Sequence, residues 1–186
     1  MIVKKLYKKN QNIILTNIKT KNLKKKQKLS ICKLKNLTWP WTVRKQLEWL
    51  KKTAKKTDVH NLMFINNRLA GYTLLRRRIA YKKNKSFIYY YFDSFVLHND
   101  FRNKGLGKVF ILFNNQILKK LKKHSFLICP KKTSKFYLKY NWKILPKNRY
   151  KIMDHKSFWF RNYKDKIGMT YNLNKKINDK ILYYFN

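Results

Sequence analysis

Apolar residues recur along the chain at two different spacings, and each spacing predicts a different kind of element. Short runs rich in β-branched and aromatic residues predict strands at residues 12–18, 59–65, 69–75, 87–97 and 125–129. Apolar residues three or four positions apart predict helices at residues 23–34, 43–50 and 106–123. A strand, two helices, three strands, a helix and another strand therefore follow one another, an order typical of an α/β fold.

The last third of the chain adds one short helix and further strands. The helix, around residues 136–140, is predicted to stop at Asn141, because asparagine adopts left-handed backbone more readily than most residues. Strands at residues 156–160 and 169–173 complete the predicted sheet. Residues 175–186 are expected to pack back onto it as a strand or a helix.

Polar residues mark where several of these elements begin or end. Thr42 precedes the second helix as its predicted N-cap, since its hydroxyl can accept a hydrogen bond from the first turn. Asn66 and Asn67 predict the tight turn of a hairpin. Three arginines, residues 76–78, are predicted to end the second hairpin strand, either as a solvated strand end or as a contact for an anionic ligand.

The chain is strongly basic, because 47 lysine and arginine residues stand against 7 acidic ones and the formal net charge is +40. Salt-sensitive, incidental binding to nucleic acid or anionic lipid is expected from this charge whatever the protein does. The basic residues are spread over the whole chain, and no nucleic-acid-binding motif is present. A basic nucleic-acid-binding module that stacks bases on exposed aromatic side chains is therefore an alternative function.

Composition also indicates the cellular location, the need for a metal and the number of domains. The two cysteines, Cys32 and Cys129, are expected to be buried and reduced, which fits a cytoplasmic protein. The four histidines lack metal-ligand spacing, so no metal is expected, and no apolar run approaches the ~18 residues of a membrane span. The chain is predicted to form a single domain, residues 1–186, whose residues 1–11 are a basic, poorly ordered tail.

The segment between the strand 87–97 and the helix 106–123 carries the strongest functional signal. It reads Arg102-Asn103-Lys104-Gly105-Leu106-Gly107-Lys108. Its two glycines allow a tight turn and leave backbone N–H groups uncovered, and its three basic side chains add positive charge. The helix that follows points the positive end of its dipole at the same place. This combination predicts a cradle for a phosphate group, and the alternative is a turn that binds no ligand.

This segment resembles the acyl-CoA loop of the GNAT superfamily of N-acyltransferases, whose pattern is Arg/Gln-x-x-Gly-x-Gly/Ala between a strand and a helix. Further on, the family commonly has Tyr-x-x-x-Gly-Phe/Trp, and this chain has Tyr137 followed by Asn141 and Trp142. Asparagine replaces the usual glycine, and Pro130 occupies the region where the family often has an asparagine. The resemblance implies a mixed, mostly antiparallel central sheet flanked by helices on both faces.

By this resemblance the protein would be an enzyme, an acyl-CoA-dependent N-acyltransferase that transfers acetyl from acetyl-CoA to an amine by direct attack. Residues 102–108 would bind the pyrophosphate of acetyl-CoA or of another acyl-CoA. Backbone N–H groups around Val96 and Leu97 would polarise the thioester carbonyl, and Tyr137 matches the family's usual general acid. A GNAT-like domain that binds CoA without turnover is a further alternative.

The general base has several candidates. Asp93 lies on the predicted central strand with the same parity as Leu97, so it is expected to face the reaction cleft. The alternative for Asp93 is a paired carboxylate without a catalytic role. Glu48 and His98 are the other candidate bases.

The acceptor is expected to be a small-molecule or protein amine, and the residues leave its identity open. Trp39 and Trp41 lie in a loop that covers the acceptor site in the resembling family. They would either shape that site or pack the loop onto the core.

Overall fold

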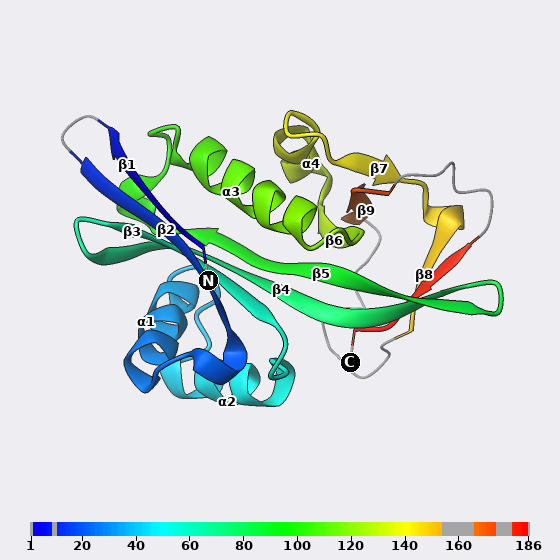
Figure 1. The fold of residues 1–186 in the computed structure, drawn as a ribbon, viewed down its shortest axis with the longest axis horizontal. Coiled ribbons are helices and arrows are strands. Elements are labelled where there is room, and N and C mark those ends of the chain that lie inside the picture. The colour runs from blue at the N-terminus through cyan, green and yellow to red at the C-terminus, as the bar shows by residue number, and fades with distance from the viewer. Residues whose placement is uncertain (1, 9–10, 154–165, 174–179, 186) are drawn as a thin grey trace. The chain divides into compact units, whose positions relative to one another are not determined.

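Figure 1 shows the chain as a ribbon in the computed structural model. The residues that the structure describes are 2–8, 11–153, 166–173 and 180–185. The predicted strand at residues 156–160 lies outside them. Two compact units make up the chain, the first with residues 1–76 and 92–114, the second with residues 77–91 and 115–186. The single domain expected from the length stays a prediction.

The described residues form a ten-stranded, mostly antiparallel sheet with four α-helices, which confirms the predicted fold class. The strand order is β1-β2-β3-β4-β5-β6-β9-β7, and β10 pairs with β4 and β8. The strands are β1 (Val3–Lys8), β2 (Gln11–Lys19), β3 (Val59–Ile65), β4 (Arg68–Lys82), β5 (Lys85–Leu97), β6 (Ser125–Pro130), β7 (Lys143–Leu145), β8 (Tyr150–Ile152), β9 (Lys166–Tyr171) and β10 (Ile181–Tyr183). The helices are α1 (Lys25–Asn36), α2 (Val43–Thr53), α3 (Leu106–Lys120) and α4 (Lys131–Leu138).

The first unit begins with an ordered strand where a poorly ordered tail was predicted at residues 1–11. β1 pairs antiparallel with β2 in continuous register, from Val3 opposite Thr16 to Lys8 opposite Gln11. The prediction is wrong because pairing with β2 satisfies the backbone N–H and C=O groups of this segment without a large apolar face. Lysines are also common on such edge strands, where they hinder pairing with another chain.

Two local predictions in the first unit are confirmed. The Thr42 hydroxyl accepts a hydrogen bond from the Lys45 N–H at 3.3 Å and so caps α2. Asn66 and Asn67 both have left-handed backbone, with φ of 47° and 65°, as the favoured two-residue hairpin turn requires. Both features depend on residues adjacent in the sequence, which explains why the sequence predicts them.

β4 is longer than predicted, because it continues through the three arginines to Lys82. Arg76 and Arg78 are buried in it, at 8% and 3% exposed. Arg76 donates from Nη1 to Asp93 Oδ2 at 3.3 Å, and Arg78 donates from Nε to the Phe185 carbonyl at 3.0 Å. A solvated strand end at residues 76–78 is therefore a wrong prediction. The buried guanidinium groups are compatible with the strand interior because acceptors from other segments bind them.

Helices cover both faces of the sheet in the first unit. On one face, Leu34 of α1 packs with Leu62 of β3 and Tyr72 of β4 in one apolar core. On the other face, Asn61 of β3 donates from Nδ2 to Asn114 Oδ1 of α3 at 2.7 Å. The predicted covering of the sheet by helices on two sides is thus present in this unit.

The second unit has a largely aromatic core. Phe126 of β6 stacks on Tyr183 of β10 with ring centroids 4.0 Å apart, so part of the segment 175–186 does pack back as a strand. The stop of α4 is confirmed, since Asn141 has a left-handed φ of 65° and the next residue, Trp142, donates from its backbone N–H to the Tyr137 carbonyl at 3.3 Å.

Because two histidines are buried, we expect the free energy of unfolding to fall at acidic pH. His60 Nδ1 lies 2.9 Å from the Tyr72 hydroxyl, and His124 Nε2 lies 2.8 Å from the Tyr183 hydroxyl. Burial lowers the pKa of His60 to about 3 and that of His124 to about 4. In the unfolded chain both pKa values return to about 6.5, so unfolding takes up protons below that pH.

We therefore expect full stability above pH ~6.5 and a progressive loss as the pH falls toward 4. Urea denaturation between pH 7.5 and 4.5 measures this dependence. His124→Gln, whose amide takes up no proton, is expected to reduce the slope. A free energy of unfolding that stays constant over this range would contradict the prediction.

Candidate functional site

Residues 102–105 form an exposed loop in the first unit, and residues 106–108 are the first residues of α3, with Leu106 buried. A short 3-10 helix, residues Asn99–Phe101, precedes the loop, and α3 begins at Leu106. Asn103 and Gly105 have left-handed backbone, with φ of 59° and 72°. A turn that contains left-handed residues can direct successive N–H groups toward a common point, and the first N–H groups of a helix have no partner within the helix.

The N–H groups of this loop are available to a ligand. Among the residues that the structure describes, none accepts a hydrogen bond from the N–H groups of residues 103–106. Lys104 and Lys108 are exposed on either side of Gly105. Free amides, the N-terminus of a helix and flanking lysines together give the chemistry of an anion site, and a phosphate fits it well.

Arg102 connects this loop to two other segments through hydrogen bonds. Its Nε donates to the Leu97 carbonyl at 3.2 Å, and its Nη2 donates to Thr38 Oγ1 at 3.3 Å. The guanidinium group therefore connects the end of β5 with the loop between α1 and α2. Its contribution to anion binding is to position the loop as well as to add charge.

A β-bulge interrupts β5 next to this loop. Ser94 has a left-handed φ of 59°, and the rings of Phe92 and Phe95 stack at 5.8 Å although the two residues are three apart. One extra residue on the strand shifts the alternation of side chains between the two faces. Asp93 and Leu97 consequently point to opposite faces, and the predicted shared parity is wrong.

Asp93 lies on the face of the sheet covered by α1 and α2. Its Oδ2 accepts from Arg76 at 3.3 Å, and its Oδ1 accepts from the Ser94 hydroxyl at 2.9 Å. The carboxylate side chain is 17% exposed. The structure therefore gives Asp93 the paired state that was its alternative, and a catalytic role for Asp93 stays a prediction. Val96, three residues after Asp93 on β5, is buried in the core on the same face.

The other two candidate bases have partners at the surface. Glu48 pairs with Arg44 one helical turn earlier at 3.1 Å, and both side chains are largely exposed. His98 lies just before the loop at residues 102–105, with Nε2 2.7 Å from Arg68 Nη2. Neither geometry favours these residues over Asp93 as a base.

The two predicted tryptophans differ in their surroundings. Trp39 packs against the apolar core below α1 and α2, together with Trp49 of α2. Trp41 is half-buried, and its backbone N–H donates to the Trp39 carbonyl at 2.8 Å. Packing of this loop onto the core is therefore observed, and a contact with the acceptor stays a prediction.

Lys35 of α1 is a buried lysine whose burial the sequence does not predict. Its side chain is buried, at 3% exposed, with Nζ 3.2 Å from the ring centroid of Trp49 and 5.8 Å from that of Trp39. Lys35 belongs to a lysine-rich helix, where no local pattern distinguishes it from its exposed neighbours. Trp39 follows Lys35 by four residues, beyond the end of α1 at Asn36, so helical spacing does not predict this contact.

Tyr137 belongs to the second unit, near the end of α4. It is buried, and its ring makes edge contacts with Phe136 and Trp142. Burial, followed by the influence of Cys129, raises the pKa of its hydroxyl well above the usual value. At neutral pH Tyr137 is therefore a protonated hydrogen-bond donor.

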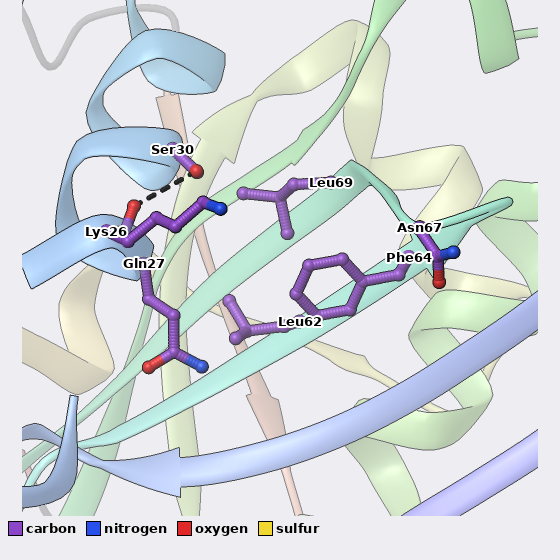
Figure 2. Close-up of a pocket in the computed structure, with 7 residues that line it drawn as sticks. All are labelled: Lys26, Gln27, Ser30, Leu62, Phe64, Asn67 and Leu69. Carbon is purple, nitrogen blue, oxygen red and sulfur yellow. Dashed lines mark hydrogen bonds between the residues drawn. The ribbon is translucent and has the colours of Figure 1, made fainter. Parts of the chain in front are cut away.

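A separate cavity of about 300 Å³ lies between α1 and the β3–β4 hairpin in the first unit (Figure 2). Apolar side chains line its floor and polar side chains its rim; the lining residues are Lys26, Gln27, Ser30, Leu62, Phe64, Asn67 and Leu69. None of the predicted site residues lines it. Ser30 uses its hydroxyl to donate to the Lys26 carbonyl at 3.0 Å.

Metal-ligand clusters and helices able to span a membrane are both absent from the part of the chain that the structure describes. No group of three or more histidine, cysteine or acidic side chains there could hold a metal ion. No helix there combines the length and the apolar character needed to cross a lipid bilayer. Cys32 and Cys129 are buried free thiols.

The fold is that of the GNAT-type N-acetyltransferases, and solved structures of such proteins superpose on most of the chain. An acyl-CoA N-acyltransferase from Pseudomonas aeruginosa is 13% identical and has a TM-score of 0.63, with 85% of this chain and 98% of that chain covered. The ribosomal-protein-S18-alanine N-acetyltransferase from Escherichia coli is 12% identical, with a TM-score of 0.57 and 84% and 92% coverage.

An aminoglycoside 6'-N-acetyltransferase complexed with coenzyme A is also similar, with 12% identity, a TM-score of 0.60, and 84% of this chain and 96% of that chain covered. No protein-family model and no curated protein sequence matches the chain. At these identities the similarity defines the fold, while the reaction has to be argued from the site.

Proposed function

We propose that this protein is an acyl-CoA-dependent N-acyltransferase that transfers acetyl from acetyl-CoA to a primary amine. The observation that carries the proposal is the loop before α3, whose N–H groups are free and whose Asn103 and Gly105 have left-handed backbone. A phosphate held there would gain from these amides and from the helix dipole. The GNAT fold supports the same reading, because one similar structure is complexed with coenzyme A.

The loop residues, the backbone amides of β5 and Tyr137 have separate roles in this function. Residues 102–108 would hold the pyrophosphate, and acyl-CoA supplies the activated acyl group when bound. Backbone N–H groups around Val96 and Leu97 would stabilise charge on the acyl oxygen. Tyr137 would give a proton to the departing sulfur, which its protonated state at neutral pH allows. The acceptor, a small-molecule or protein amine, and a cytoplasmic location are parts of the proposal.

Ligand binding and turnover test the proposal in sequence. Acetyl-CoA is expected to raise the melting temperature, because it binds the folded chain and not the unfolded one. The gain in free energy of unfolding is RT ln(1 + [L]/Kd). CoA-thiol release from acetyl-CoA, screened with amino sugars, aminoglycosides, polyamines, lysine and peptide N-termini, then measures transfer. Stabilisation without release for any amine would favour a CoA-binding domain without turnover. Absence of stabilisation would contradict the proposal.

A further inference from the structure

Exposed apolar and aromatic side chains gather on strands β4 and β10 of the second unit. Ile79 and Tyr81 of β4 are 49% and 37% exposed, and Tyr184, which follows β10, is 37% exposed. The Tyr184 backbone N–H donates to the Ile79 carbonyl at 3.2 Å, and the rings of Tyr184 and Tyr81 lie edge to face with centroids 5.4 Å apart. Large apolar side chains that are exposed together, and not singly, are typical of a binding surface.

Strand pairing extends this surface across three strands. Ala80 of β4 and Tyr183 of β10 are paired, and both belong to the buried aromatic core of the unit. Because side chains alternate between the two faces of a strand, the residues next to them point to the opposite, exposed face. On that face Leu182 of β10 is paired with Tyr81 on one side and with Lys151 of β8 on the other.

The whole surface, which we name the β4–β10 face, consists of Arg77, Ile79, Tyr81, Lys151, Leu182 and Tyr184. Arg77 and Lys151 are exposed basic residues at its margins. Among the described residues of the second unit, which are 77–91, 115–153, 166–173 and 180–185, none is acidic. The charge of this face therefore matches a negatively charged partner, and its rings match a partner with planar, apolar groups.

Single-stranded nucleic acid combines these two properties. Its phosphates are negative, and its unpaired bases have open faces that stack on tyrosine rings. A duplex matches less well, because its bases are already stacked on one another. A second copy of this chain also matches less well, since a formal net charge of +40 on each copy opposes their association.

We propose that the β4–β10 face binds single-stranded nucleic acid, with bases stacked on Tyr81 and Tyr184 and phosphates beside Arg77 and Lys151. This activity is separate from the proposed acyl transfer and does not use the loop before α3. It also differs from incidental binding by lysines spread over the chain, because it depends on two rings at one place.

Substitutions that remove only the planar rings test this inference. Tyr81→Leu and Tyr184→Leu keep an apolar side chain and the charge of the protein. Each is expected to weaken binding of oligo(dT) and of oligo(rU), both of about 15 nucleotides, by about tenfold. Tyr81→Phe keeps the ring and should bind as the wild type does. Fluorescence anisotropy at ~0.15 M salt, where binding by dispersed charge is weakened, measures these affinities.

Two controls separate stacking and location from charge. Heparin is a polyanion without bases, so Tyr81→Leu and Tyr184→Leu should retain wild-type affinity for it. Lys151→Glu should weaken oligonucleotide binding more than Lys139→Glu, which makes the same change of charge on an exposed residue at the end of α4. Equal losses from these two charge changes would overturn the inference, because dispersed charge would then explain the binding.

The wild-type protein provides a test that no substitution can disturb. An oligonucleotide that contains 4-thiouridine, cross-linked by ultraviolet light, should attach to peptides that include Tyr81 or Tyr184. Cross-links confined to other peptides would overturn the inference, as would wild-type oligonucleotide affinity in both leucine variants. Tyrosine-dependent binding to vesicles of phosphatidylglycerol and phosphatidylcholine, with oligonucleotide binding unaffected by the substitutions, would assign the face to a lipid surface and overturn it as well.

Discussion

Gly107→Glu is expected to abolish binding of acetyl-CoA while the protein stays folded. Gly107 is the second residue of α3 and follows the left-handed Gly105. A glutamate there would place bulk and negative charge where the pyrophosphate is proposed to lie. We expect affinity to fall at least ~100-fold, which corresponds to about 2.8 kcal/mol at 1.4 kcal/mol per tenfold change.

The fold should tolerate this change for a physical reason. Glycine inside a helix is unfavourable by about 0.5–1 kcal/mol relative to alanine, and an acidic residue in the first turn interacts well with the helix dipole. The melting temperature without ligand should therefore be equal to or above that of the wild type.

Gln116→Glu is the matched control, because it makes the same change of charge on an exposed position of the same helix. Isothermal titration calorimetry with acetyl-CoA measures all three proteins. Wild-type affinity in Gly107→Glu would exclude this loop as the phosphate site.

Tyr137→Phe is expected to lower kcat on the order of 10²-fold, the range typical of a lost general acid. The substitution removes only the hydroxyl, so the edge contacts of the ring with Phe136 and Trp142 are retained. Because the raised pKa keeps this hydroxyl protonated, its proposed role is to donate to the departing sulfur. Affinity for acetyl-CoA and the melting temperature should change little.

Tyr140→Phe provides the internal control for this prediction. Tyr140 is half-buried, its ring contacts Phe136, and its carbonyl accepts from Asn115 Nδ2 at 2.8 Å. None of these interactions uses its hydroxyl, so this variant should retain near wild-type turnover. Steady-state thiol release by both variants decides the matter, and equal rates for Tyr137→Phe and the wild type would remove Tyr137 from the mechanism.

Features that depend on neighbouring residues could be predicted from the amino-acid sequence. The Thr42 cap, the turn at Asn66 and Asn67 and the helix stop at Asn141 follow from backbone preferences and short-range hydrogen bonds. The turn at residues 102–105 belongs to this group, because its glycine and the start of α3 are contiguous. For the same reason, apolar spacing predicted most strands and helices and the order in which they follow.

The burial of charged side chains, and the face of the sheet that each one occupies, could be seen only in the folded structure. Arg76 remains inside β4 because Asp93, on another strand, accepts its hydrogen bond. The bulge at Ser94 moves Asp93 to the face opposite Leu97, and strict alternation does not predict such an extra residue. Lys35 resembles its exposed neighbours in sequence, yet it lies over Trp49 of the next helix. Each outcome depends on partners distant in the chain, whose distances are set only when the sheet and helices pack together.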